Sequence, residues 1–232
     1  MRHGGESNKT CKLAVDGGLT LLLLCLMAYQ VTGEALHEWF GVSMTALLIL
    51  HHLLNRRWYS ALFRGKYTAY RAVTALVNTL LLASIALTAL CGMAMSAHAV
   101  PFLYGLLPAS FARQVHLALS FGSFLLMGLH LGLHVPAMGA ALIRGGRARR
   151  ILSALSAPVA GAGLWLFCQN RLYDYILFRA PFAFFDYEKP GLMVFGENLA
   201  ILAAFAFLGA CCTALLRPAA KDEVRRANGT LQ

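Results

Sequence analysis

The chain has 232 residues, of which 59% are hydrophobic and only 13% are charged. Soluble domains carry about 25% charged residues, so a chain of this composition would expose too much apolar surface to stay monomeric in water. The net charge is +10, but the charged residues separate apolar runs of membrane-spanning length. The composition therefore excludes an ordinary soluble domain, makes nucleic acid an improbable partner, and indicates an integral membrane protein in contact with lipid.

Six apolar segments follow one another along the chain, each near the length of about 20 residues that crosses a hydrocarbon core. They run over Leu13–Val31, Leu36–Leu54, Ala72–Met95, Phe111–Val135, Ile151–Phe167 and Leu192–Leu216. The first is long enough to span and no small-residue cleavage site follows it, so we interpret it as a helix rather than a signal peptide. The fifth is the weakest, because it contains Pro158, and could instead be re-entrant or interfacial. The pattern predicts an all-α fold, a polytopic transmembrane helical bundle with six spans.

Basic residues predict the orientation of this bundle. If all six segments span and the N-terminus is cytoplasmic, sixteen of the 20 Lys and Arg residues fall on the inner side, in clusters at 2–12, 56–71, 144–150 and 217–226. The four on the outer side are Arg113, Arg171, Arg179 and Lys189. The positive-inside rule therefore predicts that both termini are cytoplasmic. A five-span version without the fifth segment would place the basic C-terminal tail outside.

The outer segment at 171–190 alternates aromatic residues with charges of both signs. One interpretation is an aromatic belt at the membrane interface. The other is a docking platform or lid over something at the outer face. The sequence leaves both interpretations open.

Six of the eight histidines lie on only two of the predicted helices. The second helix carries His37, His51 and His52, and the fourth carries His116, His130 and His134. Ionisable residues inside a membrane are costly and are functional candidates by default, although a single histidine can equally serve as an interhelical hydrogen-bonding group. The spacing of the set decides between these interpretations.

His37 precedes His51 by 14 residues, and His116 precedes His130 by the same number. Fourteen residues bring a helix back to within about 40° of the same face, with a rise of about 21 Å. Because the two helices are parallel in the predicted topology, they offer two opposed pairs of imidazoles at two depths. This predicts two bis-histidine haems, one on His37 and His116 near the outer face and one on His51 and His130 near the inner face. No Cys-x-x-Cys-His is present, which favours haem of the b type.

Two other histidines compete for the inner positions. His52 is about 60° off the face of His37, so His51 is the better partner. His134 lies on the face of His116 but one turn deeper than His130. We favour His51 and His130 as ligands and keep His52 and His134 as alternates.

Arginines and small residues near the ligands fit the same interpretation. Guanidinium groups bind carboxylates well, so Arg56, Arg57 and Arg113 are candidate contacts for haem propionates. Positive-inside anchoring explains Arg56 and Arg57 equally well. A porphyrin needs close backbone approach, and the two ligand helices offer small residues for it: Gly41, Ser43, Ala46, Gly122, Ser123 and Gly128.

At these residues the chain resembles a known family, the flavinylation-associated cytochromes (domain of unknown function 4405). The resemblance lies in T-G-E-A-L-H-E-W-F-G at 32–41, H-H-L-L-N-R-R-W-Y at 51–59, and the segments Phe63–Thr68, His130–His134 and Arg179–Glu188. More distantly, the arrangement is similar to the b-type cytochrome subunits of respiratory formate dehydrogenases and hydrogenases.

The resemblance implies a di-haem electron conduit in a bacterial cytoplasmic membrane, with His37, His51, His116 and His130 as axial ligands. It also implies an extracytoplasmic redox partner that carries covalent FMN. The chain lacks the flavinylation acceptor motif Asp-x-x-Ser/Thr-Gly-Ala-Ser/Thr, so any flavin is expected on the partner. A quinol or another inner-side reductant is the expected donor, which makes quinone a possible partner, and a homo-oligomer is compatible with the sequence.

The predicted organisation has four parts: a cytoplasmic tail at 1–12, a four-helix di-haem core at 13–145, two further membrane segments at 146–216, and a basic cytoplasmic tail at 217–232. No arrangement of nucleophile, base and orienting group is evident, so we expect an electron-transfer subunit of an oxidoreductase rather than a stand-alone catalyst. Two rival functions are a transporter that uses the histidines as a relay, and a membrane anchor that binds no haem.

Overall fold

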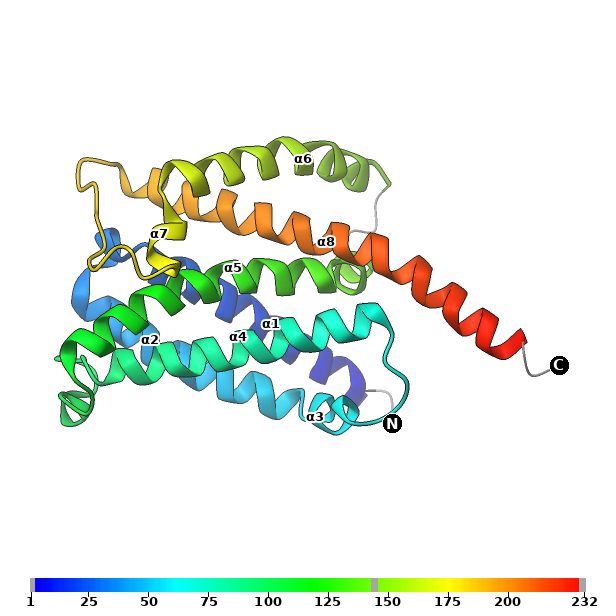
Figure 1. Ribbon diagram of the computed structural model, residues 1–232, viewed down its shortest axis with the longest axis horizontal. Helices are drawn as coiled ribbons and strands as arrows, with labels where there is room; N and C mark the ends of the chain where they lie inside the picture. The colour runs from blue at the N-terminus through cyan, green and yellow to red at the C-terminus, as the bar shows by residue number, and fades with distance from the viewer. Residues whose placement is uncertain (1–2, 143–145, 230–232) are drawn as a thin grey trace. The chain divides into compact units, whose positions relative to one another are not determined.

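A computed structural model describes residues 3–142 and 146–229 of the chain, and in these ranges it contains helices and no strand (Figure 1). The helices are α1 (His3–Met27), α2 (Tyr29–Leu54), α3 (Arg57–Leu62), α4 (Ala69–Met93), the 3₁₀ helix η1 (Pro101–Leu103), α5 (Ala109–Leu142), α6 (Gly146–Gln169), α7 (Leu172–Ile176) and α8 (Gly191–Gly229). The all-α prediction is confirmed. Side chains are described for 10–134 and 155–217, so the predicted inner-side basic residues at 2, 9, 144–150 and 221–226 lie outside the described side chains.

Four helical segments of the described chain are long and apolar enough to cross a membrane. They are Thr10–Met27 of α1, Ala69–Met93 (α4), Ala109–His134 of α5 and Gly191–Arg217 of α8, which correspond to the first, third, fourth and sixth predicted spans. The chain is therefore a membrane protein with transmembrane helices. The second predicted span, α2, has 26 residues but is less apolar, because it carries two glutamates and three histidines. In α6 only Leu155–Gln169 is apolar.

The first helix ends four residues earlier than predicted, and the second begins seven residues earlier. The first ends at Met27 instead of Val31, and α2 begins at Tyr29. The break expected near Thr32 is instead a kink within α2 at Gly33, whose φ of 71° and ψ of 174° are not helical. A positive φ of this size is open to glycine at little cost, so Gly33 can bend the chain without ending the helix.

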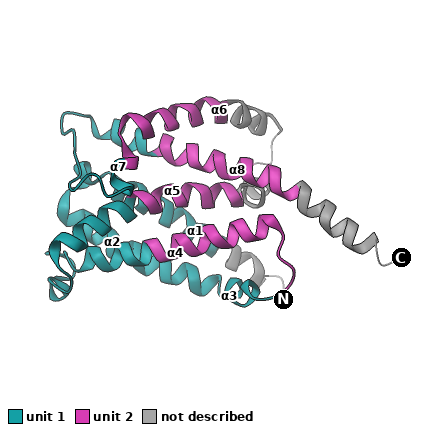
Figure 2. Cartoon of the chain, viewed as in Figure 1, with its two compact units in different colours: residues 1–64, 85–120, 174–198 teal, residues 65–84, 121–173, 199–232 magenta. Residues whose placement is uncertain are grey.

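The chain divides into two compact units, drawn in teal and magenta in Figure 2. Unit 1 comprises 1–64, 85–120 and 174–198, and unit 2 comprises 65–84, 121–173 and 199–232. Both units draw on residues from either side of the predicted boundary at 145/146.

In unit 1, α1 packs against α2. Val15, Leu19 and Leu23 recur every four residues on α1 and are buried, as expected of one face of a helix. Beyond Ala28, the start of α2 meets the outer segment, because Nε2 of Gln30 donates a 3.2 Å hydrogen bond to the carbonyl of Asp186. The predicted outer segments at 32–35 and 96–110, and the stretch at 171–190 from Asp174 onward, thus belong to this unit.

Unit 2 is held by close packing of α5 on α8. A Cβ atom at Gly132 would collide with the backbone carbonyl of Ala206, and one at Gly209 with the carbonyl of Leu129. Small residues that let two backbones approach are the usual means of joining helices in lipid, where the hydrophobic effect gives no drive for helix association. Tyr70 of α4 donates a 3.0 Å hydrogen bond to the carbonyl of Leu133 and so joins α4 to α5.

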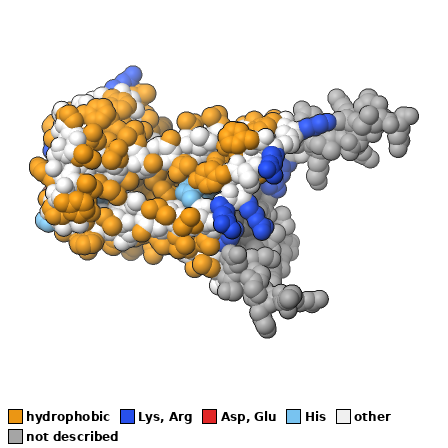
Figure 3. Space-filling view, turned by 90° about the horizontal axis from the view of Figure 1, so that it is seen from below, with side chains coloured by type: hydrophobic (Ala, Val, Ile, Leu, Met, Phe, Trp, Pro, Cys, Tyr) orange, Lys and Arg blue, Asp and Glu red, His pale blue; other side chains and the backbone are white. Residues whose placement is uncertain are grey.

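The surface has the character expected of a protein surrounded by lipid. Apolar side chains dominate the face in Figure 3, and the Lys and Arg side chains on it are gathered in groups. Large apolar residues such as Leu21, Trp165 and Leu215 are 62%, 62% and 75% exposed. Such exposure would be unfavourable in water and indicates contact with membrane lipid.

Candidate functional site

His37 on α2 and His116 on α5 lie next to each other in unit 1. The centres of their rings are 6.1 Å apart, and the ring planes are inclined by 75°. Two imidazoles that bind one iron from opposite sides have ring centres about 6 Å apart, because each nitrogen is about 2 Å from the metal and about 1 Å from its ring centre. The structure therefore brings the predicted outer pair together at a separation that suits a shared iron.

The ring of His116 is positioned by α4. Its Nδ1 lies 2.9 Å from the carbonyl oxygen of Thr88. A carbonyl can only accept a hydrogen bond, so Nδ1 is the protonated nitrogen and Nε2 is left unprotonated and able to bind a metal. A Cβ atom at Gly92 would lie only 3.0 Å from Cε1 of His116. Gly92 thus gives the imidazole room against α4.

His37 is held differently. Its Nδ1 is buried and has no hydrogen-bond partner among the described residues. The backbone carbonyl of Leu26, in the last turn of α1, lies close to the His37 ring but forms no hydrogen bond with Nδ1. The ring of Tyr29 meets that of His37 edge-on, with 5.0 Å between centres. A buried ring nitrogen without a partner requires an explanation, and an absent metal or other ligand is one.

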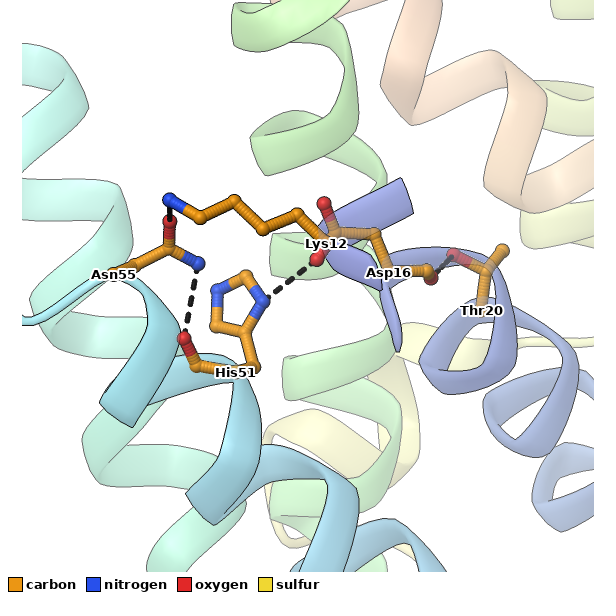
Figure 4. Close-up of polar contacts among 5 residues, drawn as sticks. All are labelled: Lys12, Asp16, Thr20, His51 and Asn55. Atoms are coloured by element: carbon orange, nitrogen blue, oxygen red, sulfur yellow. Dashed lines mark hydrogen bonds and ion pairs between the residues drawn. The ribbon is translucent and has the colours of Figure 1, made fainter. Parts of the chain in front are cut away.

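At the other end of α2, His51 belongs to a hydrogen-bonded cluster of five residues (Figure 4). Its Nδ1 lies 2.7 Å from Oδ1 of Asp16 on α1. Asn55 donates to the backbone carbonyl of His51 at 2.9 Å and accepts from Nζ of Lys12 at 3.0 Å. Thr20 donates to the backbone carbonyl of Asp16 at 2.9 Å. An ionised carboxylate only accepts, so His51 donates from Nδ1, and Nε2 is its candidate metal-binding nitrogen.

His130 belongs to unit 2, where its Nδ1 lies 2.8 Å from Oδ1 of Asn78 on α4. The amide oxygen is an acceptor, so Nδ1 again carries the proton. The ring of the alternate ligand His134 is 4.7 Å away, centre to centre, and the choice between the two stays open. Because His51 and His130 are in different units, the structure describes each with its own neighbours, and the inner pair stays a prediction.

The other alternate, His52, has a partner of another kind. Its Nδ1 lies 2.8 Å from the hydroxyl of Tyr59. A hydroxyl can donate or accept, so this contact does not determine which ring nitrogen carries the proton. The Asp16 carboxylate does determine which nitrogen of His51 carries the proton, which agrees with the preference for His51.

The three candidate propionate contacts are all exposed. The guanidinium of Arg113 lies 5.8 Å from the centre of the Phe182 ring, within the range of a cation–π contact. Arg56 and Arg57 lie at the start of α3, immediately after α2. Their role toward propionates stays a prediction.

Glu38, next to His37, joins α2 to the loop after α4. Its carboxylate accepts four hydrogen bonds of 2.7–3.0 Å, from Oγ of Ser96 and the backbone N–H groups of Ala97, His98 and Ala99. Glu34 and His98 place their own ligand atoms within 4.8 Å of those of Glu38. Because four donors already occupy the Glu38 carboxylate, we interpret the cluster as structural.

The outer segment folds onto the end of α2. Phe185 stacks on Tyr29, with 5.3 Å between ring centres, so Tyr29 contacts both this segment and His37. Lys189 forms a 2.8 Å salt bridge with Glu197 in the first turns of α8. Between these anchors, Phe184 and Tyr187 are 79% and 73% exposed.

Sequence reasoning missed the residues that position the histidines, namely Asp16, Asn78, Thr88 and Gly92. Asp16 and Asn78 had a signal, since each is a polar residue within an apolar helix, and such residues are functional candidates by default. Thr88 gave no such signal, because its contact is made by the backbone carbonyl, a group that every residue has.

One small residue has a different role from the predicted one. A Cβ atom at Gly128 would lie 2.6 Å from Cβ of Phe205 on α8, so this glycine serves the α5–α8 contact rather than access for a porphyrin. Gly41 and Gly122 have nothing within 4 Å of a Cβ position and remain compatible with such access.

No family model, no curated protein and no solved structure matches this chain. The resemblance to the flavinylation-associated cytochromes therefore stays a prediction.

Proposed function

We propose that the chain is a b-type cytochrome subunit that carries electrons across a bacterial cytoplasmic membrane. His37 and His116 bind one haem near the outer face, and His51 and His130 bind a second near the inner face. A quinol or another inner-side reductant supplies electrons, and an extracytoplasmic flavin protein or other redox protein accepts them.

The observation that supports this proposal most is the environment of the predicted ligands. In three of the four, Nδ1 faces a hydrogen-bond acceptor: Asp16 for His51, the Thr88 carbonyl for His116 and Asn78 for His130. Histidines that bind metals almost always donate their second ring N–H to a carboxylate, a carbonyl or water, which fixes the tautomer and the ring orientation. Histidines of a proton relay would gain nothing from a fixed tautomer, because they must exchange protons at both nitrogens.

The residues present fit a haem. The 6.1 Å between the ring centres of His37 and His116 suits two axial ligands, and the buried Nδ1 of His37 lacks a partner in the described structure. When bound, haem supplies reversible one-electron exchange between ferric and ferrous iron. The chain's own residues hold the imidazoles, and acceptors at Nδ1 fix the tautomers of His51, His116 and His130.

The proposal includes six spans with both termini in the cytoplasm, so α2 and α6 must also cross. The part of α2 after the kink, Glu34–Leu54, is about 31 Å long at the rise of an α-helix, close to the thickness of a hydrocarbon core. Its histidines and Glu38 reduce its apolar character, but groups that bind a cofactor or each other inside a bundle are tolerated there.

Single alanine substitutions test the outer pair. We expect His37→Ala and His116→Ala each to remove one of two haems and to leave the other, measured as haem per chain in the purified protein. His98→Ala, at an exposed histidine of the outer loop, is the matched control and should keep both. Loss of both haems, or of neither, in the two test variants would show that the pairing is wrong.

A further inference from the structure

Asp16 is an acidic residue in the apolar segment Thr10–Met27, one of the four that are able to cross a membrane. A carboxylate at such a position costs free energy and is expected to have a specific partner. Its partner is Nδ1 of His51, at 2.7 Å, and the side chains of Asp16 and His51 are 42% and 23% exposed, respectively. In the cluster of Figure 4, Lys12 lies one turn before Asp16 on α1 but donates its hydrogen bond to Asn55. The Asp16 carboxylate is therefore paired with His51 and not with Lys12.

The predicted ligands of unit 1 differ in the charge of the group that holds Nδ1. His51 faces a carboxylate, His116 faces the neutral carbonyl of Thr88, and Nδ1 of His37 has no hydrogen-bond partner in the part of the chain that the structure describes. Hydrogen bonds to an ionised acceptor are roughly twice as strong as those between neutral groups. A carboxylate therefore draws the Nδ1 proton more strongly and makes the imidazole a stronger electron donor at Nε2.

A stronger axial donor stabilises ferric iron relative to ferrous iron and so lowers the reduction potential. We propose that Asp16 is a positioning residue that lowers the potential of the haem bound by His51 below that of the haem bound by His37 and His116. This inference rests on the proposed function and supplies a physical reason for its outward direction. If both haems are bound, the iron held by His51 would lose an electron more readily than the iron held by His37 and His116. Its oxidation from ferrous to ferric would supply the electron that reduces the second iron from ferric to ferrous, so outward transfer would be favourable.

A redox titration of the purified protein, followed by the visible haem absorption, tests this inference. The wild type should show two waves. In Asp16→Asn the neutral amide replaces the carboxylate at nearly the same size, so the lower wave should move to higher potential while the upper wave stays in place and the haem content is unchanged. Glu34→Gln removes one negative charge from the exposed outer end of α2 and is the matched control, which should leave the lower wave in place.

Asp16→Glu keeps the carboxylate and should retain a lower wave close to that of the wild type. A shift of the upper wave, an equal shift of both waves, or no shift in Asp16→Asn would overturn the inference. Should Asp16→Asn fail to fold, His116→Ala decides the order directly, because the haem that remains must titrate at the lower potential, and a remaining upper wave would contradict the inference. A wild-type protein without haem would refute the proposed function itself, whereas unmoved waves in a haem-loaded variant refute only the role of Asp16.

Discussion

The four histidines that we assign as ligands are held in four different ways. A carboxylate, a backbone carbonyl and a side-chain amide face Nδ1 of His51, His116 and His130, whereas His37 is held by the ring of Tyr29. The potential of a haem depends on the basicity of its ligands, so these different contacts would give the two proposed haem sites different chemistry although both use histidine alone.

Gly92 offers a test at the residue scale. A methyl group there would lie 3.0 Å from the ring of His116, so we expect Gly92→Ala to displace the imidazole, at a cost of about 1–3 kcal/mol from overpacking. The measured consequence is a shifted or partly lost outer haem in the visible spectrum.

Gly196→Ala, where nothing lies within 4 Å of the new methyl group, is the control and should leave the spectrum as in the wild type. An unaltered spectrum in Gly92→Ala would mean that His116 does not depend on this close approach.

The sequence alone could predict the histidines but not the groups that hold them. Spacings of 14 residues are visible in a linear sequence, because helical periodicity converts them into a shared face. The contact between Asp16 and His51 joins residues that are 35 positions apart, and it depends on how α1 packs on α2. No periodicity within one helix contains that information.

At the scale of elements, Glu38 joins the outer ends of α2 and α4. Glu38→Gln replaces a carboxylate that accepts four hydrogen bonds with an amide whose NH₂ group faces other donors. We expect a loss of about 1–3 kcal/mol in stability and faster amide hydrogen exchange at Ala97, His98 and Ala99.

Glu34→Gln, on the same helix but at an exposed position, should leave exchange at these three amides unchanged. Equal protection of the loop in Glu38→Gln and the wild type would show that the carboxylate does not hold it.

The contact of α5 with α8 gives a second prediction at this scale. Gly132 packs directly on the backbone of Ala206, so the side chain in Gly132→Leu must force the two helices apart. We expect the thermal unfolding temperature of the purified protein to fall, with a loss of about 2 kcal/mol or more.

Gly161→Leu on α6 places the same side chain where nothing lies within 4 Å and should be tolerated. Similar unfolding temperatures for the two leucine variants would count against close α5–α8 packing.

The helix ends were harder to predict than the helices. Hydropathy located the apolar runs, but it could not show that the chain would break at Ala28 and continue helically to Gly33, because a left-handed glycine leaves no mark in hydropathy. Likewise, α2 is weakly apolar because of the groups that we assign to the site, so a helix that carries two of the four proposed ligands is hard to recognise as a span.

On the scale of the whole molecule, the net charge of +10 is best explained by topology. The predicted division places sixteen of 20 basic residues on the inner side, which a partner-binding surface would not require. The division into a core at 13–145 and an added pair of helices stays a prediction. Unit 2 already shows α5 packed on α8, a contact across that boundary that the sequence pattern did not indicate.

The number of haems per chain tests the central claim most directly. A pyridine haemochrome assay on the purified, folded protein gives this number. We predict two b-type haems for each 25.2 kDa chain, with a dithionite-reduced α-band at about 560 nm. A folded protein that is colourless and free of haem would contradict the account.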